Sequence, residues 1–187
     1  MDASELKKTF WNEAATGGLI LGLLMFGLSY VVYVLDWAIS HGTIVSFLQV
    51  LLMGGVIWAM GTRMTRFRGP VLGFPYGQSM KLVLAIMFFA GIIHGLGEFL
   101  LQMVIAPEYF KHLYEEALLN SGQSEAVVEQ AMAMREKIEV YLKNPLVMVL
   151  SGILTMCFMG GIVGMILSIF LKKKPDVFAE EEQADAR

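Results

Sequence analysis

Residues 80–105 read MKLVLAIMFFAGIIHGLGEFLLQMVI, and this stretch decides the fold because it is apolar for long enough to cross a membrane. A helix needs about 20 apolar residues to cross about 30 Å of hydrocarbon. Similar runs cover about residues 14–35, 43–61 and 146–171. The runs are continuous rather than alternating, which excludes transmembrane β-strands. The pattern therefore predicts four membrane-spanning helices.

The composition agrees with a membrane protein. Hydrophobic residues make up 56% of the 187-residue chain and charged residues 17%, whereas about a quarter of a soluble domain is charged. We expect an all-α integral membrane four-helix bundle over residues 1–174, as a single domain. Residues 175–187 are acidic after Pro175 and are expected to form a disordered cytoplasmic tail.

Lysine and arginine near the span ends predict the orientation. They gather before the first run, between the second and third runs and after the fourth, whereas residues 36–42 contain none. The positive-inside rule therefore places both termini in the cytoplasm.

The segment 107–144 has the pattern of an extracytoplasmic helical hairpin. Helices are predicted from about 108 to 119 and from 125 to 142, with Ser124 as N-cap of the second. An apolar stripe follows one face of that second helix: Val127, Ala131, Met134, Ile138 and Tyr141. It is expected to bury against the bundle or lipid, or to dock to another protein.

His94, Glu98 and Gln102 form a polar stripe at i, i+4 and i+8 within the third apolar run. Ionisable groups at membrane depth are costly and point to function. Asp36 and His41 are the candidate outer partners. The stripe predicts either an outward-facing polar pocket for protons, a cation or a headgroup, or a hydrogen-bonded cluster that only pins helices.

No cofactor or metal is expected. One histidine and one glutamate are too few for a zinc site, which takes three or four ligands. A bis-histidine haem needs two histidines at similar depth, and only His94 lies well inside a run. The sequence also lacks the common nucleotide, hydrolase and zinc-protease motifs.

Arg63, Arg66, Arg68 and Lys81 lie around the predicted cytoplasmic loop between the second and third spans. They predict contact with anionic lipid and topology control, or recognition of a lipid phosphate. Glycine pairs within the spans predict close helix packing, either within one chain or with a second copy or partner helix. These pairs are Gly18 and Gly22, Gly54 and Gly55, Gly91 and Gly95, and Gly160 and Gly164.

Short motifs then point to a family. The chain reads Gly73-Phe74-x-Tyr76-Gly77-Gln78-x-x-Lys81, then Pro107-Glu108-Tyr109, then a glycine-rich last span that ends in Lys172-Lys173-Lys174. From about Phe10 to Lys174 it resembles the bacterial "domain of unknown function 4199" family. The resemblance implies a bacterial inner-membrane protein with no established activity, cofactor or catalytic residue. It also implies an association with glycosyltransferases that act on polyprenyl-phosphate sugars, because members often lie beside them.

Two functions are therefore expected. The first is a non-enzymatic accessory or scaffold subunit that contacts membrane lipid and either a protein partner or a second copy. The alternative is a small oligomeric transporter or lipid-handling protein, with polyprenyl-phosphate-linked sugars as the implied substrate class. An intramembrane metal enzyme is a third hypothesis. Nucleic acid is not an expected partner.

Overall fold

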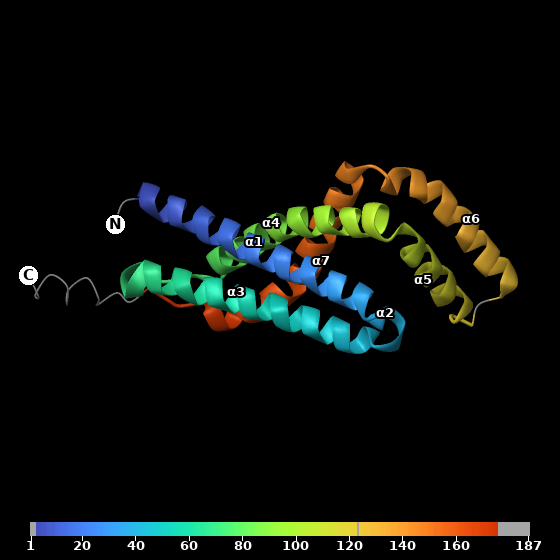
Figure 1. Ribbon diagram of the computed structural model, residues 1–187. Coiled ribbons are helices and arrows are strands. Elements are labelled where there is room, and N and C mark those ends of the chain that lie inside the picture. The colour runs from blue at the N-terminus through green and yellow to red at the C-terminus, as the bar shows by residue number, and fades with distance from the viewer. Residues whose placement is uncertain (1–2, 123, 176–187) are drawn as a thin grey trace, which may run out of the picture.

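The computed structural model describes residues 3–122 and 124–175, which are helical almost throughout (Figure 1). The elements in order are α1 (Ala3–Val34), α2 (Trp37–Ser40), α3 (Gly42–Leu72), α4 (Tyr76–Phe99), the π-helix η1 (Leu100–Ile105), α5 (Pro107–Leu119), α6 (Glu125–Leu142) and α7 (Pro145–Leu171). Four of these stretches are long and apolar enough to span a membrane: Ser4–Val34, Gly42–Gly69, Tyr76–Ile105 and Pro145–Leu171. The predicted all-α membrane bundle is confirmed, and the chain is a multi-pass membrane protein.

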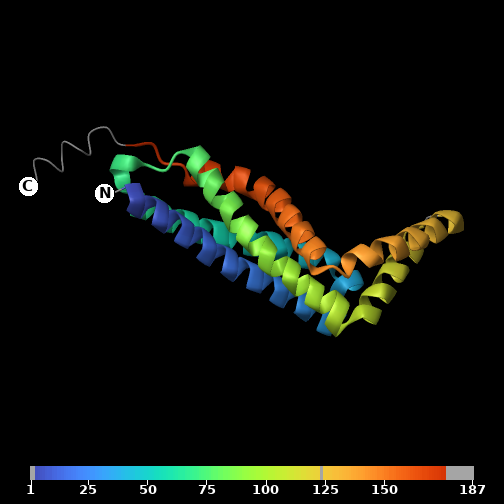
Figure 2. The same cartoon turned by 90° about the horizontal axis from the view of Figure 1, so that it is seen from above.

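The four long helices form a bundle with two different ends. The start of α1 and the end of α7 lie together at one end, called here the terminal end, and α5 and α6 lie at the other, called the hairpin end (Figure 1). The hairpin does not continue the bundle axis but turns well away from it (Figure 2). It meets the bundle where η1 ends and α7 begins.

Helix α4 is the central packing element, because it lies against both α1 and α7. Glycines let it approach α7 closely. A Cβ atom on Gly91 would lie 2.5 Å from the Ile153 Cα, and one on Gly95 would lie 2.8 Å from the Val149 Cα. Gly152 of α7 fits the same crossing, since its Cβ would lie 2.8 Å from the Gly95 Cα.

The other predicted glycine pairs differ in whether they contact a neighbouring helix. Gly18 and Gly22 of α1 also pack on α4, and Gly160 and Gly164 face the side chains of Met87 and Val83. Gly55 has no atom within 4 Å of an added Cβ. Glycines of α1, α4 and α7 therefore serve packing within one chain.

The middle of the bundle is filled by side chains. Leu21, Met25, Ile57, Ile86 and Met87 are each at most 1% exposed. Towards the terminal end, the Ser79 hydroxyl of α4 donates to the Ser168 Oγ of α7 across 3.0 Å, and both residues are buried. This pair satisfies two polar groups inside an apolar bundle.

Helix α3 continues further than the sequence predicts. The sequence predicts an end near Gly61, but the helix runs to Leu72 with a kink at Gly69, where φ is +65°. Arginine and methionine are good helix formers, and no glycine or proline occurs between Gly61 and Gly69. Arg63, Arg66 and Arg68 therefore lie on a helix and not in a loop.

Two backbone hydrogen bonds join the link between α3 and α4 to the residues that follow α7. The Phe74 N–H donates to the Lys173 carbonyl at 2.8 Å, and the Lys173 N–H donates to the Phe74 carbonyl at 2.9 Å. Gly73 has φ +56°, and a Cβ there would lie 2.6 Å from the Pro175 nitrogen. Only glycine fits this position without strain, which gives the Gly73-Phe74 motif a structural reason.

The hairpin helices have nearly the predicted bounds. A π-turn precedes them, because the Ala106 N–H donates to the Leu101 carbonyl, five residues back, at 2.9 Å. Ala106 itself is not helical (φ −140°, ψ 51°), as expected for a residue before proline. Ser124 precedes α6 as predicted, but its side chain makes no capping hydrogen bond.

The predicted disordered tail lies, beyond Pro175, outside the described residues.

Candidate functional site

The polar stripe on α4 and η1 forms a connected chain of side chains. The Gln102 Nε2 donates to the Glu98 Oε2 at 2.7 Å, and the His94 Nδ1 lies 3.9 Å from the Glu98 Oε1. The His94 and Glu98 side chains are only 15% and 18% exposed. The His94 Nδ1 is buried, and no described residue hydrogen-bonds it. A histidine beside a carboxylate can hold or pass a proton.

Glu98 also lines a cavity of about 110 Å³ near the hairpin end. Five helices supply its walls: Ser29, Val32 and Tyr33 from α1, Ala38 from α2, Val45 and Gln49 from α3, Glu98 from α4, and Tyr109 and Phe110 from α5. A cavity of this size holds a few water-sized molecules. Its chemistry therefore suits protons, water or a small cation.

No described contact joins Asp36 to the stripe. Asp36 instead contacts Tyr109, which lines the cavity. The Tyr109 hydroxyl donates to the Asp36 Oδ1 at 3.0 Å, and the Tyr109 ring packs edge-on against Tyr33 at 4.9 Å. Burial, followed by the hydrogen bond and charge of Asp36, raises the pKa of Tyr109 to about 12. Tyr109 therefore stays a protonated donor and ties α5 to the turn after α1.

His41, the other predicted partner, lies apart from the stripe. Its Nδ1 hydrogen-bonds the Ser40 hydroxyl at 2.7 Å, and its ring lies 5.1 Å from that of Trp37. Among residues 3–122 and 124–175, no group of three or more His, Cys, Asp or Glu side chains could hold a metal ion.

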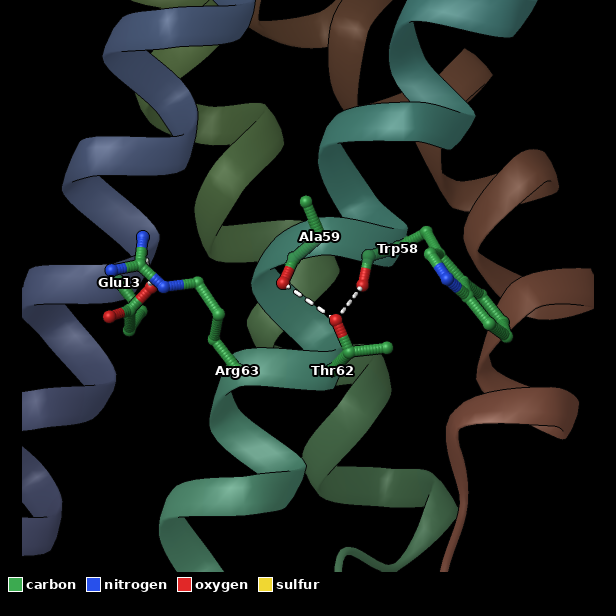
Figure 3. Close-up of polar contacts among 5 residues, drawn as sticks. All are labelled: Glu13, Trp58, Ala59, Thr62 and Arg63. Atoms are coloured by element: carbon green, nitrogen blue, oxygen red, sulfur yellow. Dashed lines mark hydrogen bonds and ion pairs between the residues drawn. The ribbon is translucent and has the colours of Figure 1, made fainter.

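The basic residues predicted for lipid contact fall into separate environments. The Arg63 Nη1 reaches across from α3 to the Glu13 Oε2 of α1 at 3.7 Å (Figure 3). Arg63 is 61% exposed and Glu13 is 15% exposed, so the ion pair is partly screened by solvent. The neighbouring Thr62 hydroxyl bonds back to the Trp58 and Ala59 carbonyls of its own helix at 2.9 Å. Arg63 thus joins two bundle helices.

Arg66 and Arg68 differ although only two positions separate them. Arg66 is exposed on α3. Arg68 lines a cavity of about 250 Å³ together with Lys81 of α4 and Lys7 of α1. The Arg68 Nε donates to the Gly73 carbonyl at 2.6 Å, which fixes the guanidinium beside this cavity.

Arg135 joins the two helices of the hairpin, which also enclose a groove. The Arg135 Nη1 and Nη2 of α6 donate to the Lys111 and Phe110 carbonyls of α5 at 3.0 and 3.2 Å. Its guanidinium carbon lies 4.5 Å from the centre of the Tyr114 ring. The groove between the helices has a volume of about 400 Å³ and is mostly apolar; Leu113, Ala117, Ile138 and Leu142 are among its lining residues.

Sequence reasoning missed Glu13, Tyr109 and Lys7 as site residues. Tyr109 belongs to the Pro107-Glu108-Tyr109 motif in the first turn of α5, and its nearness to Asp36 depends on how α5 turns back. Lys7 had the weakest signal, because it precedes the first apolar run and its neighbours in space come from α3 and α4.

Comparison with known proteins adds a family but no activity. No curated protein and no solved structure matches the chain. One family model matches residues 16–173, which cover all four candidate spans in whole or in large part. The chain therefore belongs to the family described as "Protein of unknown function (DUF4199)".

Proposed function

We propose that this membrane protein is a non-enzymatic accessory or scaffold subunit of a membrane complex, with the α5–α6 hairpin as its contact surface. The observation that carries the proposal is the apolar stripe of α6, which lies outside the four candidate spans. Val127, Met134 and Tyr141 of the stripe are 46%, 64% and 67% exposed. An exposed apolar patch rimmed by polar residues is typical of an interaction site.

The hairpin surface suits a protein partner of particular chemistry. Ile138 belongs both to the stripe and to the groove beside α5, so the two apolar features are continuous. Residues 107–144 contain seven glutamates against four lysines and arginines. Complementary charge at the rim gives an interface its specificity. The partner surface is therefore apolar with a basic margin.

The bundle acts as the anchor of this complex. Lys and Arg at the terminal end support an orientation with both termini in the cytoplasm of a bacterium and the hairpin outside its inner membrane. The middle of the bundle is filled by buried side chains such as Leu21 and Met87. This packing supports an anchoring role rather than a transport path through a single copy of the chain.

Transport, the alternative function, takes its support from the cavity beside Glu98. If Glu98 belongs to a path, Glu98→Gln abolishes function while expression is kept. The accessory role predicts instead that Glu98→Gln leaves partner binding through the hairpin unchanged. Lipid handling has separate support at the terminal end, where cationic side chains surround one cavity.

The test is site-specific photo-cross-linking of the full chain in native membranes. A benzoylphenylalanine at Met134 or Tyr141 probes the stripe, and one at Glu129, exposed on the opposite face of α6, is the matched control. We expect the same protein adduct from both stripe positions and none from the control. The adduct should also disappear when Ile138→Asp places a charge in the stripe.

Two results would overturn the proposal. Adducts with lipid alone would show that α6 lies on the membrane surface, as amphipathic helices can. Equal protein adducts from Glu129 and from the stripe would show random collision rather than a defined interface.

A further inference from the structure

Three cationic side chains from three helices surround the cavity at the terminal end. Lys7 comes from α1, Arg68 from α3 and Lys81 from α4. Arg68 is half-buried, and the two lysines are exposed at the rim. Because these residues are far apart in sequence, only the folded bundle brings their charges together. Like charges in one place repel each other unless an anion lies among them.

The three cations have no counter-ion within the part of the chain that the structure describes. The ion pairs found there join other groups, such as Arg63 with Glu13. Arg68 uses its Nε to bond the Gly73 carbonyl, and no described residue accepts a hydrogen bond from its Nη atoms. Among the described residues, nothing occupies the terminal nitrogens of the fork, which leaves them open to a ligand.

The rest of the lining indicates what kind of anion fits. Leu6, Phe10 and Met64 are apolar, and Gln78 adds a neutral amide. A soluble anion gains nothing from the apolar part, but a lipid has apolar groups directly below its headgroup. Candidate spans begin or end at Ser4, Gly69 and Tyr76, at the same end of the bundle. A cavity beside the ends of three candidate spans is expected at the depth of lipid headgroups.

We propose that this cavity binds the phosphate group of a membrane lipid. The guanidinium of Arg68 takes two phosphate oxygens, a geometry that arginine matches and lysine does not. Lys7 and Lys81 approach the same phosphate as point charges, and Leu6 and Phe10 contact the first apolar atoms of the lipid. None of the cavity's lining residues belongs to the hairpin. The lipid site and the accessory function can therefore be tested separately.

The test is calorimetric titration of the full chain, purified in uncharged detergent at fixed salt. The probes are short-chain phosphatidic acid, phosphatidylcholine of the same chain length, and inorganic phosphate. We expect saturable binding of phosphatidic acid that Lys7→Gln and Lys81→Gln each weaken about tenfold, the effect of losing one charged hydrogen bond. Lys81→Arg should retain binding.

Arg66→Gln is the matched control, because it removes the same charge from α3 outside the cavity. It should leave binding within about twofold. If Arg66→Gln weakens binding as much as Lys81→Gln, or if phosphatidylcholine binds equally well, the proposal is overturned in favour of general attraction to anionic surfaces. Displacement of phosphatidic acid by equimolar inorganic phosphate would retain the phosphate site but overturn the lipid as its source. Unchanged unfolding temperatures of the variants show that the effects are local.

Discussion

Helices α7 and α6 both expose large apolar side chains, but for different physical reasons. On α7, Leu150, Leu154 and Phe158 are 60%, 71% and 70% exposed, and they lie within a candidate span where hydrocarbon covers them. On α6, Met134 and Tyr141 are exposed to a similar degree but lie outside every candidate span. Exposure therefore has a different meaning at different membrane depths, and the α6 stripe is apolar surface that lipid tails do not cover.

The two regions also differ in how they are held. The bundle is joined by glycine contacts between α4 and its neighbours, whereas the hairpin is joined by side-chain hydrogen bonds of Arg135 and Tyr109. Backbone crossings cannot shift without moving whole helices, but hydrogen bonds at the surface can open locally. The comparison predicts a rigid anchor that carries a more loosely attached contact surface.

The largest expected effect is on the bundle. Gly91→Leu places atoms where the Ile153 backbone already lies, at 2.5 Å from the Cβ position, and should lower the unfolding free energy by about 3 kcal/mol. Gly55→Leu is the control because its Cβ meets nothing within 4 Å, and it should change stability by about 1 kcal/mol or less. Unfolding in mixed micelles followed by circular dichroism measures both. Equal losses in the two variants would refute the packing account.

A smaller and local effect is expected in the hairpin. Arg135→Gln removes two hydrogen bonds to α5 carbonyls and the contact with Tyr114, together worth about 1–2 kcal/mol at an exposed site. Amide hydrogen exchange should rise in α5 and α6 and stay unchanged in α4. Lys137→Gln removes the same charge from the same helix without a described contact, and it should have no effect. Increased exchange throughout the bundle would show that the hairpin is part of one cooperative unit.

Tyr109→Phe should act at the point where the hairpin joins the bundle. The change removes the donor to Asp36 and should cost about 1 kcal/mol, detected as faster exchange in the first turn of α5. Asp36→Asn keeps an acceptor, and asparagine tolerates the left-handed backbone of this residue, where φ is 53°. It should therefore have the smaller effect. A larger effect for Asp36→Asn would mean that the charge matters more than the hydrogen bond.

The same contact gives the smallest predicted effect, on pH dependence. The pKa of Tyr109 is raised to about 12, above its ordinary value of about 10, so the protonated hydroxyl is favoured in the folded protein. Its contribution to stability is complete below pH about 10 and is lost as the pH rises through about 12. Tyrosinate absorbance should show a step near pH 12 in the wild type that Tyr109→Phe lacks. Identical titrations would contradict the assignment.

The sequence predicted elements well and tertiary neighbours poorly. Apolar run length and the helical pattern of residues 107–144 indicated the four spans and the hairpin, because both signals are local. The i, i+4, i+8 spacing predicted one polar stripe, and the structure adds a hydrogen bond between Gln102 and Glu98 within it. The Glu13–Arg63 ion pair joins two helices, and Lys7 and Arg68 line one cavity from two helices; both arrangements depend on helix rotation. The end of α3 differs from the prediction because the arginines after Gly61 end the apolar run but still favour a helix.

The central claim, that the α6 stripe is covered by a protein partner, is tested most directly by hydrogen exchange of α6 in two settings. One is the native membrane, and the other is the purified chain in nanodiscs made from the same lipids. The account predicts that residues 127–141 are protected in the native membrane and exchange freely in the nanodiscs, while α4 is protected in both. Equal protection of α6 in lipid alone, or equal exchange in both settings, would contradict it.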